Sequence, residues 1–286
     1  MLLSAYLVPH GNQIIPGLEE PYHEGFRPLH QAMEEARRQL EGEQADLLVL
    51  VTPHGITLAD AYGVYLNERL QGFYYDLRES NVFGQLKGRA LWPSDRPAAE
   101  ELLSALEGAR LPAAGLVQGS TAFPIALTWG ELVPLHYLGS AGSPRVVVVS
   151  LPRSRANLPQ VRGQLFALGQ ALLEFANRGR RRVSLVISAD LAHTHAAGGP
   201  YGVHSSAPAF DHLAQEWAWQ PTRERLAALL ELQPTALACG MAGMCALQPV
   251  LEAASLPCSG VTYAAPTYFG MMVAHWGSSP SLGIVL

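Results

Sequence analysis

Two segments of the same pattern, Val-Pro-His-Gly at 8–11 and Thr-Pro-His-Gly at 52–55, carry the residues best suited to chemistry. Each follows an apolar run that predicts a buried strand, and each places one histidine, His10 or His54, where that strand ends. The proline fixes the local backbone, and the glycine permits a tight turn with close approach to a ligand. Because a neutral imidazole binds zinc, iron or copper readily, we expect His10 and His54 to converge on one metal ion. A hydrogen-bonded turn histidine is the alternative for either residue alone.

A third histidine-rich segment, Ser-Ala-Asp-Leu-Ala-His-Thr-His at 188–195, also follows an apolar run. His193 and His195 can each supply a base or a metal ligand, and Asp190 can orient an imidazole or simply close the turn. The spacing matches no common zinc motif, since His-Glu-x-x-His is absent. We take His193, His195 and Asp190 as the catalytic candidates, with an ordinary polar loop as the alternative.

The elements that must position these residues alternate between short apolar runs and longer amphipathic patterns. We predict strands at 2–8, 47–51, 132–138, 146–151, 183–188, 260–264, 271–274 and 282–286. We predict helices at 28–40, 97–106, 158–177, 207–218, 222–230 and 243–253, with Asp95 as the N-cap of the second. The alternation predicts an α/β fold with a central mostly parallel or mixed sheet flanked by helices. No linker rich in Pro, Gly or Ser divides the chain, so we expect a single domain over residues 1–286.

The bulk composition argues against several classes of protein. The 286 residues are 49% hydrophobic and 15% charged, which is ample for a large core. A net charge of −5 without a basic stripe argues against nucleic acid as a partner. The arginine-rich run at 178–182 precedes an apolar strand and is interpreted as a helix-to-strand turn. No apolar run approaches the ~20 residues of a membrane span, so no membrane partner is expected.

Cysteine usage indicates a reduced compartment. The three cysteines, Cys239, Cys245 and Cys258, are odd in number and form no Cys-x-x-Cys pair. The sequence opens on a strand-like run, without the basic segment and cleavage site of a signal peptide. We therefore expect a cytoplasmic protein, and a homodimer is the default expectation for its assembly.

The order of four motifs resembles one known family. Pro-His-Gly follows the first strand, Thr-Pro-His-Gly follows the second, Gly-Glu-Leu-Val-Pro-Leu stands at 130–135, and Ser-Ala-Asp-Leu-Ala-His stands at 188–193. This arrangement resembles the beta-subunit superfamily of class III extradiol ring-cleavage dioxygenases, typified by protocatechuate 4,5-dioxygenase and related in fold to Memo-type proteins. The resemblance extends to Ala-Ala-Pro-Thr-Tyr at 264–268 and implies an α/β domain of the extradiol dioxygenase class III type.

The resemblance implies a non-haem Fe(II) site of two histidines and one carboxylate, with a further histidine as acid/base. By position, His10 and His54 correspond to the metal-binding histidines, and His193 corresponds to the acid/base histidine. Such a ligand set leaves open positions where a catecholate and O2 bind together. The nearby histidine can take a phenolic proton and later return it. The implied reaction is the ring cleavage of a catechol-like or aminophenol-like aromatic substrate with O2.

Two positions depart from the family pattern. Where the family has a carboxylate ligand before a glycine, this chain has Cys239 before Gly240, as Memo-type proteins do. A Cys239 thiolate as third ligand would favour zinc or copper(I), and a small buried hydrophobe is the alternative interpretation. The second departure is Thr-Trp-Gly at 128–130, where many relatives have Asp-His-Gly. Trp129 is interpreted as core filler, with an aromatic wall of the substrate pocket as the alternative.

Other aromatic and histidine residues have a weaker sequence context. Tyr263 and Tyr268 can line a pocket for an aromatic ring, although aromatic residues at a strand end are more often packing elements. His136 falls in the predicted strand at 132–138 and is interpreted as a satisfied core residue.

The leading hypothesis is an Fe(II)-dependent extradiol dioxygenase with His10, His54 and Cys239 around the metal and His193 as acid/base. His195 and Asp190 would support that site. Zinc is the alternative metal. Two other functions stay open: a Memo-like metal-binding protein without oxygenase activity, and a zinc-dependent hydrolase on the same scaffold.

Overall fold

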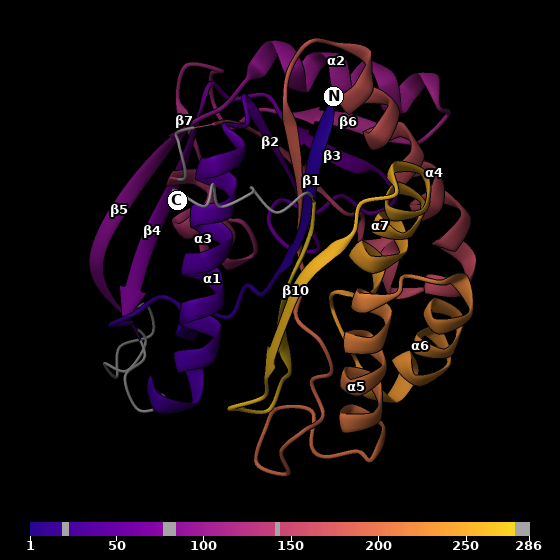
Figure 1. The fold of residues 1–286 in the computed structure, drawn as a ribbon. Coiled ribbons are helices and arrows are strands. Elements are labelled where there is room, and N and C mark those ends of the chain that lie inside the picture. The colour runs from indigo at the N-terminus through magenta and orange to yellow at the C-terminus, as the bar shows by residue number, and fades with distance from the viewer. Residues whose placement is uncertain (19–22, 77–83, 141–143, 278–286) are drawn as a thin grey trace, which may run out of the picture.

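A mixed sheet of eight strands forms the centre of the residues that the computed structural model describes, 1–18, 23–76, 84–140 and 144–277 (Figure 1). Its strand order is β10-β11-β1-β9-β2-β8-β3-β6. Four neighbouring strands in the middle are parallel: β1 (Leu2–Val8), β9 (Val183–Ser188), β2 (Leu47–Thr52) and β8 (Arg145–Ser150). The flanking strands are β11 (Met271–Gly277), β10 (Cys258–Ala264), β3 (Tyr62–Tyr65) and β6 (Ala113–Leu116). The predicted mixed sheet is therefore confirmed.

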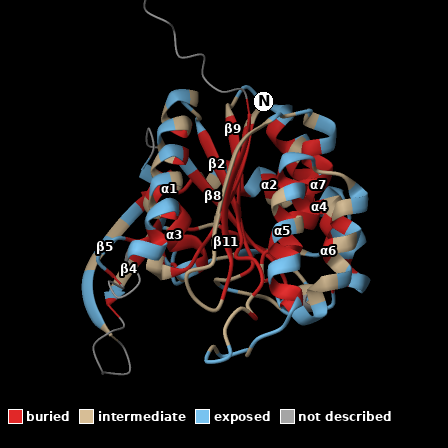
Figure 2. Cartoon of the chain, turned by 60° about the horizontal axis from the view of Figure 1, so that its bottom comes forward, coloured by how far each residue is buried: buried red, intermediate tan, exposed pale blue. Residues whose placement is uncertain are grey.

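Helices cover both faces of this sheet, which gives three layers (Figure 2). One face carries α1 (His23–Glu43) and α3 (Trp129–Tyr137). The other face carries α2 (Arg96–Gly108), α4 (Leu158–Arg178), α5 (Ser206–Trp219), α6 (Arg223–Ala236) and α7 (Met241–Ala254). None of the helices in the described part of the chain is long and apolar enough to cross a membrane.

The alternation of side chains along the central strands divides the core in two. In β1, Ala5 and Leu7 belong to the apolar cluster under α4 and α7, whereas Tyr6 and Val8 belong to the cluster under α1 and α3. Successive strand residues point to opposite faces, and both faces are covered, so β2 and β9 are buried at every position. This burial explains why these strands were predictable as largely apolar runs.

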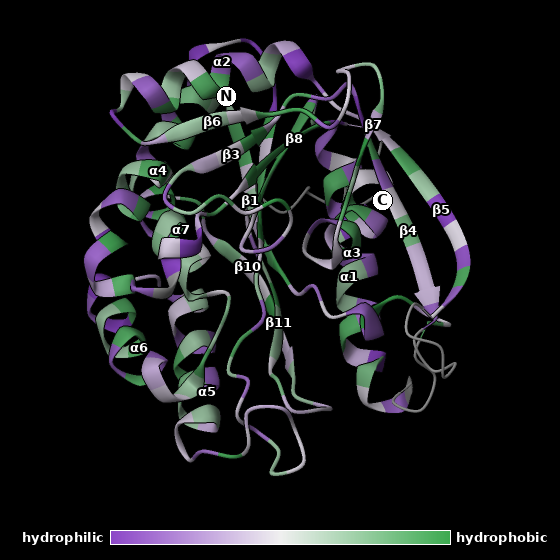
Figure 3. Ribbon diagram, turned by 180° about the vertical axis from the view of Figure 1, so that it is seen from behind, coloured by the Kyte–Doolittle hydropathy of each residue, from purple (hydrophilic) through white to green (hydrophobic). Residues whose placement is uncertain are grey.

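A second sheet, β5-β4-β7, lies beside α1 and α3 and was not predicted (Figure 1). Its strands are β4 (Arg69–Asp76), β5 (Gln85–Pro93) and β7 (Pro124–Ala126). Figure 3 shows hydrophilic residues interrupting β5, and most of its side chains are at least partly exposed. A strand with so little burial lacks the apolar run on which strand prediction depends.

The predicted strand at 132–138 is wrong, because the helix α3 occupies this segment. Thr128 and Glu131 form a capping box in which the Glu131 carboxylate accepts from the Thr128 backbone, and this box starts the helix. Nearly every residue of α3 is buried, so its apolar run carries no helical period to distinguish it from a strand. His136 lies on this helix, where its Nδ1 pairs with the Tyr74 hydroxyl at 3.1 Å.

The remaining predicted elements that fall within the described residues are confirmed, with shifted ends. Asp95 caps α2 by accepting from the Ala98 amide at 3.1 Å. The arginine-rich segment after α4 is a helix-to-strand connection, as expected. The largest differences in bounds are in α1, which begins at His23, and in α6, which continues to Ala236. The strand predicted at 282–286 lies outside the described residues.

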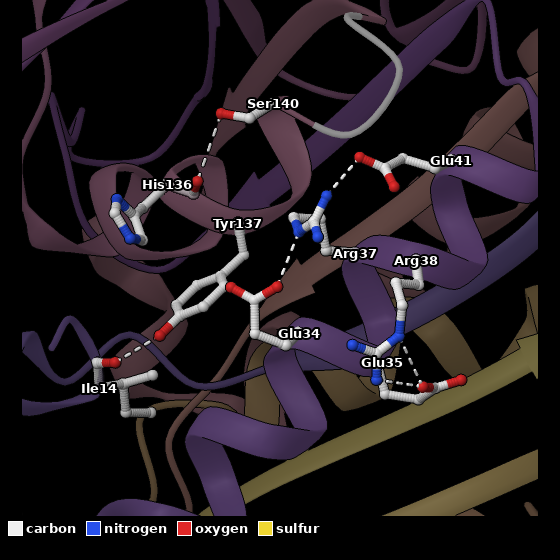
Figure 4. Close-up of polar contacts among 9 residues, drawn as sticks. All are labelled: Ile14, Glu34, Glu35, Arg37, Arg38, Glu41, His136, Tyr137 and Ser140. Carbon is white, nitrogen blue, oxygen red and sulfur yellow. Dashed lines mark hydrogen bonds and ion pairs between the residues drawn. The ribbon is translucent and has the colours of Figure 1, made fainter.

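A buried contact joins α3 to the turn after β1. The Tyr137 hydroxyl donates to the Ile14 carbonyl at 2.6 Å (Figure 4). This bond fixes the segment that follows the first Pro-His-Gly turn against α3.

On the neighbouring α1, Arg37 pairs with Glu34 at 2.8 Å and with Glu41 one turn further on (Figure 4).

Candidate metal centre and active site

Three adjacent strand ends bring the first candidate residues together. Because β9 lies between β1 and β2 and all three are parallel, their carboxyl ends meet at one edge of the sheet. His10, His54 and Asp190 each stand two residues beyond one of these ends. The rings of His10 and His54 lie 4.7 Å apart, centroid to centroid, and nearly perpendicular. The structure thus brings together the two imidazoles of the Pro-His-Gly turns.

Cys239 joins this group from the segment just before α7. Its Sγ lies 3.3 Å from His10 Nε2, and one donor atom each from His10, His54 and Cys239 lie within 4.8 Å of one another. Asp190, His193 and Cys239 form a second group by the same measure. A side chain at Gly240 would place its Cβ 2.8 Å from the Asp190 carbonyl oxygen. The glycine therefore permits the close approach that brings Cys239 against the β9 turn.

The protonation of His10 follows from its hydrogen-bond partners. Ser188 Oγ lies 2.6 Å from the Gly130 carbonyl, which can only accept, so the single serine proton is used there. At the 2.8 Å contact with His10 Nδ1, Ser188 must then be the acceptor. His10 therefore carries its proton on Nδ1 and directs the Nε2 lone pair towards Cys239. A second residue that fixes the imidazole tautomer in this way is usual behind a metal-binding histidine.

Asp190 faces the same Nε2 lone pair. Its Oδ2 lies 3.2 Å from His10 Nε2, while its Oδ1 accepts from the His10 amide at 3.0 Å. Burial raises the pKa of Asp190 to about 7, although the amides of His10 and Gly11 oppose this rise. A lone pair and a carboxylate oxygen at this distance repel one another unless a proton or a cation lies between them. The donor set of nitrogen, sulfur and oxygen therefore fits a transition-metal ion.

Burial keeps the imidazoles of the site neutral near pH 7. It lowers the pKa of His10 well below the ordinary value, and the neighbouring His54 and His193 lower it further. The pKa of His54 falls to about 4 through burial, with smaller effects of Arg155 and His193. Burial, followed by the charge of Asp190, raises the pKa of the Cys239 thiol. The histidines are thus ready to ligate, whereas a Cys239 thiolate needs a compensating cation.

His193 is placed as a neutral base. Its Nδ1 lies 2.7 Å from the Leu191 carbonyl, so Nδ1 carries the proton and Nε2 keeps its lone pair. The ring stacks on Phe269 at 5.4 Å between centroids and meets Tyr201 edge-on at 5.8 Å. Burial lowers the pKa of His193. A neutral imidazole with a fixed ring and one free nitrogen is suited to accept a proton from a substrate.

Four of these residues, His10, His54, Asp190 and His193, open onto a pocket of about 260 Å³. Its lining combines polar donors with aromatic rings: His10, Gly11, Asn12, Gln13, His54, Trp129, Asp190, His193, Tyr201, Tyr268 and Phe269. Trp129 is 48% exposed, and its ring lies 5.1 Å from that of His54, so the interpretation as core filler is wrong. Trp129 instead forms an aromatic wall of the pocket. Tyr268 also lines it, as the sequence allowed.

His195 is not among the residues that line this pocket. Its Nε2 lies 2.6 Å from Asp211 Oδ2, the oxygen that also accepts from the Tyr263 hydroxyl at 2.8 Å. The other oxygen of buried Asp211 accepts from the Ala192 amide at 2.9 Å. Tyr263 and His195 therefore belong to a network that fixes the backbone next to His193.

A buried carboxylate fixes the turn that carries His54. Glu131 accepts from the Tyr65 hydroxyl at 2.7 Å, and the Tyr65 oxygen accepts from the Ile56 amide at 2.8 Å. Gly55 lies against the Glu131 and Tyr65 side chains and has φ of +88°, a left-handed conformation that favours glycine. A Cβ built on Gly55 would lie 1.9 Å from Glu131 Oε1. The glycine of the second Pro-His-Gly turn is thus required both by its backbone conformation and by the space around it.

Gly55→Ala is expected to lower the free energy of unfolding by about 3 kcal/mol, from left-handed strain of about 1–2 kcal/mol and overpacking of about 1–3 kcal/mol. Urea unfolding followed by circular dichroism measures this change. Gly202→Ala is the matched control, because Gly202 has φ of +70° but nothing within 4 Å of the added Cβ. Equal losses of stability in the two variants would show that the contact with Glu131 has no role.

Sequence reasoning missed several of these supporting residues. Ser188 and Glu131 lie inside the motifs that carried the family resemblance, and the Thr128–Glu131 spacing of a capping box is readable in the sequence. Asp211 is a single acidic residue in the middle of α5, and no local pattern marks it. No sequence pattern marked Tyr201 as a pocket residue either.

The comparisons with known proteins concern the family and the fold of the chain. The family model of the catalytic LigB subunit of aromatic ring-opening dioxygenase matches residues 4–272. Protein CA_C1420 of Clostridium acetobutylicum is 20% identical over 209 residues, which cover 72% of this chain and 42% of that protein. The matched region is therefore less than half of that relative's length.

The likeness to a solved structure concerns the fold. The crystal structure of the uncharacterized protein JW3007 from Escherichia coli K12 superposes with a TM-score of 0.56 at 16% sequence identity. The superposition covers 96% of this chain and 99% of that one. Since the family match spans nearly the whole chain, the protein belongs to the family of the catalytic LigB subunit of aromatic ring-opening dioxygenase.

Proposed function

We propose that this protein opens the ring of a small catechol-like or aminophenol-like aromatic with O2, using Fe(II) held by His10, His54 and Cys239. The observation that carries the proposal is the convergence of the His10 Nε2 lone pair, the Cys239 sulfur and the Asp190 carboxylate below an aromatic-lined pocket. When bound there, Fe(II) would supply positions for a substrate oxygen and O2 side by side.

The chain's own residues would bind the substrate and move its protons. The faces of Tyr201, Tyr268 and Phe269 offer stacking surfaces for one aromatic ring. His193 Nε2 would accept a phenolic proton and later return it to the opened product. The pocket volume of about 260 Å³ lies just below the usual range of about 300–1,000 Å³ for ligand sites, which favours a single ring over a larger substrate.

A second candidate function rests on the sulfur ligand. A thiolate in the position of the family's carboxylate favours zinc or copper(I) over an oxygenase iron. This protein would then be a Memo-like metal-binding protein without oxygenase activity, or a zinc-dependent hydrolase on the same scaffold. The closeness of Cys239 Sγ to His10 Nε2, 3.3 Å, is the observation in favour of this candidate.

The bound metal separates the two candidates. The protein is purified anaerobically, its metals are measured by mass spectrometry, and O2 uptake is followed with a panel of catechols and aminophenols. Iron together with catechol-dependent O2 uptake supports ring opening. Tightly bound zinc or copper, with no O2 uptake after Fe(II) is supplied, would replace the dioxygenase proposal by the second candidate.

The pH dependence of metal affinity should reveal the role of Asp190. With a pKa raised to about 7, Asp190 holds a proton below pH 7, and metal binding must displace it. The Cys239 thiol, whose pKa is also raised, must lose its proton at every pH in this range. The logarithm of the wild-type Zn²⁺ association constant should therefore rise by about two per pH unit below pH 7 and by about one above it.

In Asp190→Asn the slope should be about one throughout, because only the thiol proton is released. Competition titration with a chromophoric chelator over about 1.5 pH units on either side of the raised pKa of Asp190 measures both slopes. A slope of two below pH 7 in the Asp190→Asn variant would exclude Asp190 as the second proton donor.

A further inference from the structure

A second cluster of reactive side chains lies at the opposite end of the sheet from the metal centre. Glu43, the last residue of α1, meets Ser4 near the start of β1 and Ser184 near the start of β9. The carboxyl ends of these two strands lead to His10 and Asp190 instead. His275 of β11 and Ser259 of β10 complete the cluster. None of its members takes part in the proposed ring opening.

Glu43 is held as a carboxylate by several donors. Its oxygens accept from Ser4 Oγ at 2.6 Å, from Tyr6 Oη at 2.8 Å and from Ser184 Oγ at 2.9 Å. Burial by itself raises the pKa of Glu43, but the hydrogen bonds from His275 and these hydroxyls outweigh it and leave the pKa below its ordinary value. An ionised Glu43 can only accept hydrogen bonds.

The state of His275 follows from that of Glu43. His275 Nε2 lies 3.2 Å from Glu43 Oε1, so Nε2 must carry the proton. In the neutral form of the ring the other nitrogen, Nδ1, bears a lone pair, and Ser259 Oγ lies 2.5 Å from it and 3.4 Å from the His275 carbonyl oxygen. His275 is 3% exposed, and its ring stacks on that of Tyr6 at 4.5 Å between centroids. A serine hydroxyl, an imidazole and a carboxylate are thus connected through the two ring nitrogens of His275.

A β-bulge directs Ser259 towards this imidazole. In the pairing of β10 with β11, Cys258 lies opposite Trp276 and Gly260 lies opposite His275, so Ser259 is the extra residue. A bulge turns a side chain away from the direction that regular pairing would give it. Ser259 is also partly exposed on an edge strand of the sheet, whereas the histidine beneath it is buried. The hydroxyl therefore combines access from solvent with a buried base.

We propose that Ser259, His275 and Glu43 form a second active site, a serine nucleophile with its base and orienting carboxylate, which hydrolyses small activated acyl esters. The Ser259 Oγ proton passes to His275 Nδ1 while Oγ bonds to the acyl carbon. The carbon–oxygen bond of the ester then breaks, and the alcohol leaves with the proton from His275. Water attacks the acyl-serine in the same way, which releases a carboxylic acid and restores Ser259. No metal takes part.

A fluorophosphonate probe tests the nucleophile on the full chain. Ser259 displaces fluoride from phosphorus and keeps a stable adduct, which intact-mass and peptide-mass spectrometry count and locate. We expect one adduct on Ser259 in the wild type, with or without EDTA, and none there in Ser259→Ala. In His275→Gln the labelling rate should fall at least about a hundredfold, because the general base is lost. Ser104→Ala, which removes an exposed hydroxyl on α2, should label like the wild type.

Two outcomes would overturn the second active site. Labelling of Ser259 at the same rate in His275→Gln would mean that the hydroxyl is only exposed, not activated. A wild-type protein without an adduct on Ser259 would mean that the cluster only holds the strands together. Should circular dichroism show that His275→Gln is unfolded, p-nitrophenyl acetate hydrolysis decides instead: Ser259→Ala must lose it, and a rate equal to that of Ser104→Ala contradicts the proposal.

Discussion

Replacing His10 or His54 by alanine is expected to lower the affinity of the protein for Fe(II) and for Zn²⁺ by about a thousandfold or more. Each variant removes one of the donors that converge on the same point, and a loss of about 4 kcal/mol corresponds to this factor. Both imidazoles are neutral because burial lowers the pKa of each. Their removal therefore leaves no unpaired buried charge, and the variants should fold.

The measurement is a competition titration of the metal-free protein with a chromophoric chelator, accompanied by the metal content after purification. His212→Ala is the control, since the His212 side chain is 77% exposed on α5 and outside the pocket. Unchanged metal content in both His10→Ala and His54→Ala would show that the two Pro-His-Gly turns are structural. That result would also contradict the proposed function.

His193→Ala is expected to lower kcat for ring opening about 10²- to 10⁴-fold while the metal is retained. The variant removes the free Nε2 that we assign to proton transfer but leaves His10, His54 and Cys239 in place. Steady-state O2 uptake with the best catechol of the panel gives kcat, and mass spectrometry of the same sample gives the metal content. The His212→Ala variant again provides the reference for an exposed histidine.

The same variant distinguishes the two groups of donor atoms that share Cys239. If the metal is held by His10, His54 and Cys239, its content is the same in His193→Ala as in the wild type. Loss of the metal in His193→Ala would assign it to Asp190, His193 and Cys239 instead. Full turnover with metal retained would exclude His193 as the acid/base residue.

The local part of the site was predictable from the sequence. The parallel strands β1, β2 and β9 are largely apolar runs because both faces of the sheet are covered. A histidine between proline and glycine directly after such a run stands at the carboxyl edge of the sheet. This reasoning correctly expected His10 and His54 to lie together. Prediction from apolar runs failed for the buried helix α3, because a helix that is apolar all round shows no helical periodicity in its sequence.

The long-range part of the site was decided by the tertiary structure. The residues of the 188–195 segment left both His193 and His195 open as base or ligand, and only the family resemblance favoured His193. The packed structure places His193 at the pocket and His195 against Asp211. The pairing of Ser259 with His275 depends on a bulge between β10 and β11, which no periodic pattern encodes.

The sequence by itself determined the central parallel strands, the two Pro-His-Gly turns and hence the edge of the sheet where the chemistry is placed. Only the tertiary structure brings the side chains of the site into contact: Cys239, a candidate ligand from the family resemblance, reaches His10 across 229 positions of the chain. The physical reason is that strand ends follow from local burial and turn residues, whereas donor contacts depend on strand order and on how closely α7 packs against β9. Gly240 permits that packing because it has no side chain. The lack of space for a side chain there is visible only once both segments are in place.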